Sequence, residues 1–229
     1  MTLSIFLPIK KNSKRLKNKN FLPIFKYKLG LTQIKILQLL KLIKLLEKKK
    51  ISSEIIISTD SKNLIEKYKN NKYIKFYKRH KSLTRDDCLD ELIKEVPKIC
   101  FGNYILWTHV TSPFFNSKDY LNFILKFFKQ KKFTSAFSAT LSSTFFMSSK
   151  FKWVSHDYKK KKWPRTQDLD KYYFVNNAAF ISTRKNYLIN HDRICKKTLP
   201  IISRKYSDID IDNSNDFYFL KKNYTNIQI

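Results

Sequence analysis

Glycine is scarce in this sequence, which has only two glycines in 229 residues. A Walker A phosphate loop is excluded because no GKS or GKT element is present. The three cysteines, Cys88, Cys100 and Cys195, form no CxxC pair, which argues against a zinc site or a disulfide framework and favours a reducing compartment. No stretch approaches the ~18 apolar residues of a membrane helix, and the apolar run at the N-terminus precedes its positive charge, unlike a signal peptide. We therefore expect a cytoplasmic protein with no membrane partner.

Acidic residues are also few, because 18 Asp and Glu stand against 47 Lys and Arg, a formal net charge of +29. Such a charge attracts nucleic acid, an anionic membrane or small anions. The excess is nearly all lysine, and the sequence is rich in Ile and Asn, which also fits codon drift in an AT-rich genome. Both explanations stay open. A hydrophobic content of 42% and an aromatic content of 15% support a folded core.

Strand-like and helix-like segments alternate through the first 132 residues, which predicts an α/β class. We expect a single Rossmann-like domain over residues 1–229 with a mainly parallel sheet. A small β-rich insertion at about 140–172 interrupts it, between strand-like segments at 133–141 and 171–183. Earlier strands are predicted at 3–9, 53–61, 73–79 and 103–112, and helices at 31–50, 62–70, 90–100 and 117–132.

The predicted helix at 31–50 is amphipathic. Its apolar residues recur at helical spacing, so they define a core-facing side. Its lysines are expected on the opposite face and at the C-terminal end, where the helix dipole favours cations. The apolar positions are Ile36, Leu39, Leu40, Ile43 and Leu46.

An acidic cluster near the C-terminus is the sharpest local signal in so basic a chain. The segment SDIDIDNSNDF contains Asp208, Asp210, Asp212 and Asp216. At strand spacing the first three carboxylates share one face, where they repel one another unless a cation is bound. Carboxylates suit Mg²⁺, so a metal site is one interpretation. The alternative is a solvated acidic turn in which Asp212 or Asn213 caps the following helix.

A lysine-rich loop follows the first predicted strand. The stretch KKNSKRLKNKN contains Asn12, Asn18 and Asn20, and asparagine tolerates left-handed turns better than other non-glycine residues. An open parallel sheet binds ligands outside the carboxyl ends of its strands, so this loop is a candidate phosphate site. A triphosphate would bring lysines and Mg²⁺ to the same place.

Six ordered segments, covering nearly the whole chain, resemble the acylneuraminate cytidylyltransferases (CMP-sialic acid synthetases). Ser13, Lys14, Lys19 and Asn20 match the first motif of that family, IPARxGSKxxxxKN. The other segments are ISTDS (57–61), Arg79 before HKSL, TSPF (111–114), RTQDLDKYYFVNNAAF (165–180) and DIDNSNDF (210–217). The KPL-type first motif and QGDEP segment of the Kdo cytidylyltransferases are missing.

The resemblance implies transfer of CMP from CTP to the anomeric hydroxyl of a sialic-type nonulosonic acid, with release of pyrophosphate. It also implies Mg²⁺ as the cofactor and a homodimer joined through the insertion. Its catalytic residues would be Lys10 and Lys19, and its metal ligands Asp210 and Asp212. The nucleotide would contact Asn12, Ser13, Asn20 and Arg79. The sugar would contact Thr111, Ser112, Arg165, Gln167, Tyr173 and Asn176.

The sequence departs from the family pattern at several positions. Lys10 replaces an arginine, which keeps the charge but loses the bidentate fork. Lys11 and Asn12 replace loop glycines, His109 replaces a common glutamine, and Asn177 replaces the glycine of NGA. The alternatives are a basic nucleic-acid-binding protein, which leaves the clustered aspartates unexplained, and a relative that has drifted out of catalysis.

Overall fold

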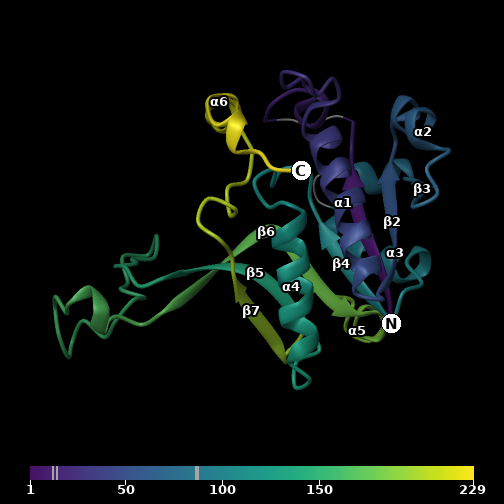
Figure 1. The fold of residues 1–229 in the computed structure, drawn as a ribbon. Helices are drawn as coiled ribbons and strands as arrows, with labels where there is room; N and C mark the ends of the chain where they lie inside the picture. Colours follow the sequence, from purple (N-terminus) through teal and green to yellow (C-terminus); the bar gives the residue numbers. More distant parts are fainter. Residues whose placement is uncertain (12, 14, 86–87) are drawn as a thin grey trace.

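A computed structural model of the chain describes residues 1–11, 13, 15–85 and 88–229. Its core is a seven-stranded sheet of order β3-β2-β1-β4-β6-β5-β7 (Figure 1). The strands are β1 (Thr2–Ile9), β2 (Ser52–Thr59), β3 (Ile74–Lys78), β4 (Tyr104–Thr108), β5 (Ser135–Ser142), β6 (Tyr172–Thr183) and β7 (Thr198–Ile202). Only β6 runs against the other strands, because it pairs antiparallel with both β4 and β5. The predicted α/β domain with a mainly parallel sheet is confirmed.

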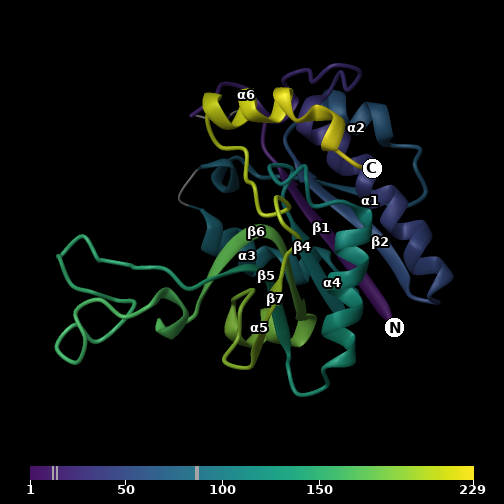
Figure 2. The same ribbon diagram turned by 60° about the vertical axis from the view of Figure 1, so that its left-hand side comes forward.

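Helices cover both faces of the sheet (Figures 1 and 2). They are α1 (Gly30–Lys48), α2 (Lys62–Tyr68), α3 (Leu89–Ile99), α4 (Ser117–Lys129), α5 (Arg184–Asn190) and α6 (Ser214–Lys222). Alternation along β1 supplies both faces, because Ile5 and Leu7 join the core under α1 and α4, while Phe6 joins the core under α3. No described helix is both long and apolar enough to cross a membrane.

Helix α1 departs from the expected distribution of its lysines. Its apolar positions are buried as predicted, with Leu40 partly exposed. Lys35, however, points into the core and is completely buried. The prediction that the lysines share the solvent face is wrong at this position, because three oxygen acceptors surround the Lys35 ammonium and replace its water.

Both glycines stand where a side chain cannot be accommodated. Gly30 starts α1 with a φ of +51°, and a Cβ there would lie 2.0 Å from the carbonyl oxygen of Leu22. A Cβ on Gly102 would lie 2.6 Å from the backbone nitrogen of Ser4. Glycine is thus retained at a left-handed helix start and at a close contact between chain segments.

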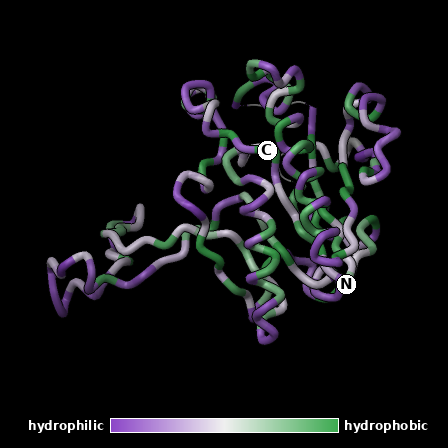
Figure 3. Tube along the Cα trace, in the orientation of Figure 1, coloured by the Kyte–Doolittle hydropathy of each residue, from purple (hydrophilic) through white to green (hydrophobic). Residues whose placement is uncertain are grey.

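The segment between β5 and β6 forms an arm that extends away from the body in both ribbon views (Figures 1 and 2). Its outer tip is largely hydrophilic, whereas the strands of the body are largely hydrophobic (Figure 3). Phe145, Trp153 and Trp163 contact one another on the arm, with ring centroids 5.4 to 6.0 Å apart. Trp163 is still 65% exposed. The insertion expected at about 140–172 therefore projects from the sheet, and its role in dimerisation stays a prediction.

Candidate active site

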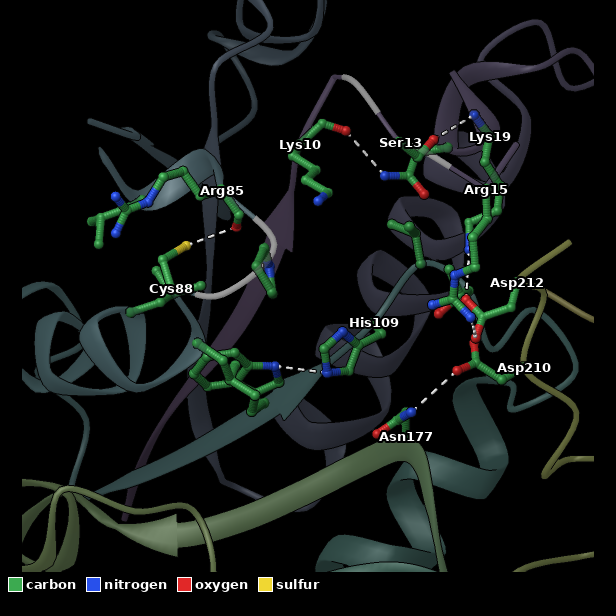
Figure 4. Close-up of a pocket in the computed structure, with 18 of the residues that line it drawn as sticks. Lys10, Ser13, Arg15, Lys19, Arg85, Cys88, His109, Asn177, Asp210 and Asp212 are labelled. Atoms are coloured by element: carbon green, nitrogen blue, oxygen red, sulfur yellow. Dashed lines mark hydrogen bonds and ion pairs between the residues drawn. The ribbon is translucent and has the colours of Figure 1, made fainter. Parts of the chain in front are cut away.

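A pocket of about 580 Å³ opens at the carboxyl ends of the parallel strands. Lys10 follows β1, Arg79 follows β3 and His109 follows β4, and all three line it. Neighbouring parallel strands end at the same edge of a sheet. The strand order reverses between β1 and β4, and helices α1 and α3 pack on opposite faces, so a crevice forms at that edge. Asp210 and Asp212 close the pocket from the segment before α6. Figure 4 shows Lys10, His109, Asp210 and Asp212 around a common opening.

The lysine-rich loop is held in shape by its own polar groups. The Ser13 hydroxyl donates to the Leu16 carbonyl (2.7 Å) and accepts from the backbone N–H of Lys19 (3.0 Å). The Asn20 amide donates to the Lys10 carbonyl (3.0 Å), tying the end of the loop to its start. Asn18 adopts the predicted left-handed conformation, with a φ of 55°. Asn20 does not, and Asn12, like Lys14, lies outside the described residues.

Lys19 connects this loop to the acidic segment. Its Nζ lies 2.8 Å from Oδ1 of Asp212, and Arg15 Nη1 lies 2.8 Å from Oδ2 of the same carboxylate. Burial alone raises the pKa of Asp212, but the hydrogen bonds and charges of Lys19 and Arg15 outweigh it, so the pKa lies below its usual value. Asp212 is therefore a carboxylate at neutral pH.

Asp210 lies deeper in the pocket wall. Asn177 Nδ2 donates to its Oδ2 (3.2 Å), while its buried Oδ1 has no hydrogen-bond partner among the described residues. Burial raises the pKa of Asp210 and outweighs the hydrogen bonds from Thr111 and Asn177, which lower it, while the neighbouring Asp212 charge adds to the rise. Such a buried oxygen favours a cation or a proton beside it.

The acidic segment is not a strand. Residues 203–213 are irregular, and Asp208 faces away from the pocket, where it accepts from the Thr140 hydroxyl (2.8 Å). The prediction of three carboxylates on one strand face is therefore wrong, since only Asp210 and Asp212 share the pocket. Asn213 caps α6, as one alternative proposed, and Asp216 accepts from the backbone N–H groups of Asp212 and Asn213.

Two carboxylates suffice for a magnesium ion that takes its remaining ligands from phosphate and water. The described residues contain no group of three or more His, Cys, Asp or Glu side chains close enough to hold a metal by themselves. The unpartnered Oδ1 of Asp210 beside Asp212 fits an ion shared with a phosphate. The donor set is compatible with Mg²⁺ and excludes a closed protein cage in the described part of the chain.

A bulge in β6 directs Asn177 at Asp210. Pairing between β5 and β6 shifts register after Phe137, so extra residues of β6 are looped out. Ala179 N–H donates to the Ser138 hydroxyl (2.9 Å), and the Asn176 amide donates to the Ser203 hydroxyl (3.0 Å). Asn176 thus braces the bulge, and the neighbouring Asn177 lines the pocket.

Comparison with known proteins assigns the chain to a family. The family model described as Cytidylyltransferase matches residues 5–220. The chain belongs to the cytidylyltransferase family. No curated protein sequence is significantly similar to it.

Solved structures have the same fold as this cytidylyltransferase at low sequence identity. One is a CMP:2-keto-3-deoxy-manno-octonic acid synthetase complexed with CTP (11% identity, TM-score 0.64, 98% of this chain and 99% of that chain). Another is the 4-diphosphocytidyl-2C-methyl-D-erythritol synthase of Anaerococcus prevotii (13%, 0.66, 97% and 96%). A third is HddC of Yersinia pseudotuberculosis (11%, 0.56, 96% and 99%). At these identities the likeness shows the fold alone.

Most residues of the predicted nucleotide site of this cytidylyltransferase lie together. Lys10, Ser13, Lys19, Asn20 and Arg79 all line the pocket. Arg79 is buried and donates to the Ser58 hydroxyl (3.2 Å) and the Ser58 carbonyl (3.0 Å). Its guanidinium is therefore fixed at the end of β2, although burial lowers its pKa.

The predicted sugar residues of this cytidylyltransferase are more scattered. Thr111 lines the pocket, and its carbonyl accepts from Ile211 N–H (2.8 Å). Ser112 is buried and outside the lining. Arg165 and Gln167 lie on the arm, where the Arg165 side chain is 71% exposed and paired with Asp168. Tyr173, at the start of β6, is 50% exposed. No arm residue lines the pocket of its own chain among the residues described.

Sequence reasoning missed Lys35. Its ammonium donates to the carbonyls of Ser112 (2.9 Å) and Phe115 (3.0 Å) and to the Tyr120 hydroxyl (2.9 Å). Burial lowers the pKa of Lys35 to about 7, although Asp119 and Asp210 oppose the shift. Lys35 holds the turn that follows Thr111 and so supports the pocket wall. A lysine on the apolar side of a predicted helix was the only sequence signal.

Sequence reasoning also missed how His109 is held. The Trp107 indole donates to His109 Nε2 (2.9 Å), so the neutral ring carries its proton on Nδ1. Burial lowers the pKa of His109 to about 3, and the charges of Arg193, Lys35 and Arg79 add to the effect. The imidazole is thus a neutral hydrogen-bond donor at neutral pH. Its Nδ1 side faces the pocket opening (Figure 4).

Proposed function

We propose that the protein transfers CMP from CTP to the anomeric hydroxyl of a sialic-type nonulosonic acid. The anomeric oxygen forms a bond to the α-phosphorus as the bond from that phosphorus to the leaving pyrophosphate breaks, and the hydroxyl proton is released. Membership of the cytidylyltransferase family supports nucleotidyl transfer. The six-motif resemblance to acylneuraminate cytidylyltransferases supports the choice of acceptor.

One observation carries the proposal. Lys19 and Asp212, which are 193 residues apart in the sequence, meet at 2.8 Å on the wall of one pocket. A triphosphate needs cations around its oxygens, and a divalent ion bound to it needs carboxylates nearby. Both groups are available here, beside Lys10.

Each residue has a proposed task. Lys10 and Lys19 neutralise the phosphates, and Ser13 with the loop N–H groups positions them. Asn20 and Arg79 contact the nucleoside. Asp210 and Asp212 would hold Mg²⁺, which when bound supplies positive charge at the phosphates and polarises the attacking hydroxyl. A carboxylate offers about four lone-pair sites, so Asp212 can keep Lys19 while it also accepts a metal.

We also propose a homodimer joined through the arm. Arg165 and Gln167 are far along the arm and outside their own pocket. If they contact the sugar, a second copy must present them. The exposed Trp163 and Tyr173 would then be covered at the interface.

The test is pyrophosphate release from CTP and Mg²⁺ with a panel of nonulosonic acids. Asp212→Asn should lower kcat by about 100-fold or more, as loss of a charge that acts on the transition state does. Asp208→Asn is the matched control, since Asp208 belongs to the same segment but contacts Thr140 outside the pocket.

Release that depends on the acceptor and on Asp212 supports the proposal. No release with any acid, together with tight RNA binding that weakens steeply with salt, would instead support the nucleic-acid alternative. Activity that survives Asp212→Asn would remove the metal assignment and leave the reaction in place.

A further inference from the structure

Arg193 is a half-buried cation of the pocket to which the proposed reaction assigns no role. It follows α5, after His191 has ended that helix in a left-handed conformation. Its guanidinium lies between two rings, 4.8 Å from the centre of Trp107 on β4 and 4.1 Å from the centre of Phe180 on β6. Two aromatic faces fix its plane, and the residue lines the pocket.

The Arg193 guanidinium is only partly satisfied. Its Nη1 is fully buried and has no hydrogen-bond partner among the described residues. The adjacent Asp192 uses Oδ1 to accept from the backbone N–H groups of Arg193 and Ile194. A desolvated guanidinium with a free donor strongly favours an oxyanion, above all a carboxylate.

His109 lies beside this donor. Its Nε2 accepts from the same Trp107 ring that packs on Arg193, so its Nδ1–H faces the pocket. A charged donor and a neutral donor thus line the same pocket, and both contact the Trp107 ring. Their chemistry selects a group with two acceptor oxygens.

This pair of donors is separate from the expected triphosphate site. Lys10, Ser13 and Lys19 belong to the loop after β1, whereas His109 follows β4 and Arg193 follows α5. In Figure 4 His109 lies across the opening from Ser13 and Lys19, on the side of Asn177. An acceptor that meets the α-phosphate from the β4 side would contact His109 and Arg193.

We infer that Arg193 is a specificity-determining residue whose guanidinium binds a carboxylate of the acceptor sugar, with the Nδ1–H of His109 as the second donor. This inference rests on the proposed function. It gives a role to an arginine that is held against Trp107 and Phe180 on the pocket wall, and it makes the acceptor's acid group a requirement for binding.

The experiment compares Arg193→Met and Arg193→Lys with the wild type, using CTP and the best acceptor of the panel. Arg193→Met should raise the acceptor KM by about 10- to 100-fold, the usual effect of losing a charged hydrogen bond, and should change the CTP KM by less than about 3-fold. Arg193→Lys keeps the charge without the fork and should give an intermediate KM. Arg204→Met is the control, because Arg204 pairs with Asp119 away from the pocket.

An acceptor whose carboxylate is replaced by a carboxamide separates recognition from packing. The wild type should lose affinity for the amide, whereas Arg193→Met should bind acid and amide about equally. The inference would be overturned if exchanging the acid for the amide weakened acceptor binding equally in the wild type and in Arg193→Met. It would also be overturned if Arg193→Met raised only the KM for CTP. If Arg193→Met does not fold, the same comparison is made with Arg193→Lys. Wild-type turnover without acid preference refutes this inference alone, whereas no turnover with any acceptor refutes the proposed function as well.

Discussion

Single residues set the charge states of this pocket. Lys35 and His109 are both neutralised in part by burial, since their pKa values fall to about 7 and about 3. The pKa of Asp212 is lowered by Lys19 and Arg15 despite its partial burial, so this carboxylate stays ionised. Burial thus removes the charge of His109 after β4, whereas the loop and Asp212 keep their charges where phosphate and metal are expected.

Lys35 gives a pH-dependent stability. Its folded pKa of about 7 lies below the ordinary 10.5, so between these values the unfolded chain binds more protons at this site than the folded chain. The free energy of unfolding therefore rises with pH across this window, by up to ~1.4 kcal/mol per pH unit from this group. Below pH 7 Lys35 is protonated in both the folded and the unfolded chain, so its contribution to the free energy of unfolding no longer changes with pH.

Urea unfolding of the wild type and Lys35→Met between pH 6 and 10 tests this. The wild type should gain stability relative to the variant from about pH 7 upwards. Lys44→Met, an exposed lysine on the same helix, should show no such trend. A difference between wild type and Lys35→Met that stays flat with pH would contradict the shifted pKa.

Secondary-structure elements place these residues, and the ends of the elements matter most. Apolar patterns predicted strands at 3–9 and 103–112, which are present as β1 and β4. They also predicted helices at 31–50 and 117–132, which are present as α1 and α4. Helix α5 and strand β7 were not predicted, because their short segments carry little periodicity. The position of Asp212 depends on the cap of α6.

Asn213→Ala tests that dependence. Asn213 accepts from the backbone N–H groups of Asn215 (2.9 Å) and Asp216 (3.1 Å), and loss of such a cap costs about 1 kcal/mol. Because Asp212 immediately precedes the cap, the variant should also lose activity several-fold. Asn116→Ala removes an equivalent capping box from α4, outside the pocket, and should cost similar stability with less activity. Thermal melts and pyrophosphate assays on both variants decide this, and equal activity losses would contradict it.

The whole molecule combines an open seven-stranded sheet, covered by helices, with a projecting arm. The arm carries Arg165, which the proposed reaction uses and which its own pocket lacks. In a dimer with exchanged arms, each pocket would be completed by the other chain. A projecting arm can bring residues of one copy to the site of another.

Mixing two inactive variants tests this exchange. Asp212→Asn disables the pocket of its own chain but leaves its arm intact. Arg165→Ala disables the arm but leaves the pocket of its own chain intact. A mixed dimer then contains one complete site, so random subunit exchange should restore about one quarter of wild-type activity. Sedimentation of the wild type should give twice the chain mass. A monomer, or no recovery on mixing, would contradict the exchange of arms, and an Arg165→Ala variant with full activity would place Arg165 outside the reaction.

The sequence by itself determined the α/β class, the cytidylyltransferase likeness and most residues of the candidate nucleotide site. These follow from local patterns, since apolar periodicity defines strands and helices, and Lys19, Asn20 and Arg79 occur in recognisable motifs. Tertiary structure alone decided that Asp208 leaves the acidic cluster and that Asn176 braces a bulge while Asn177 enters the pocket. It also decided that Lys35 is a buried cation and that Arg193 lines the pocket. These outcomes depend on which distant groups surround a side chain, and spacing along the chain carries no information about them.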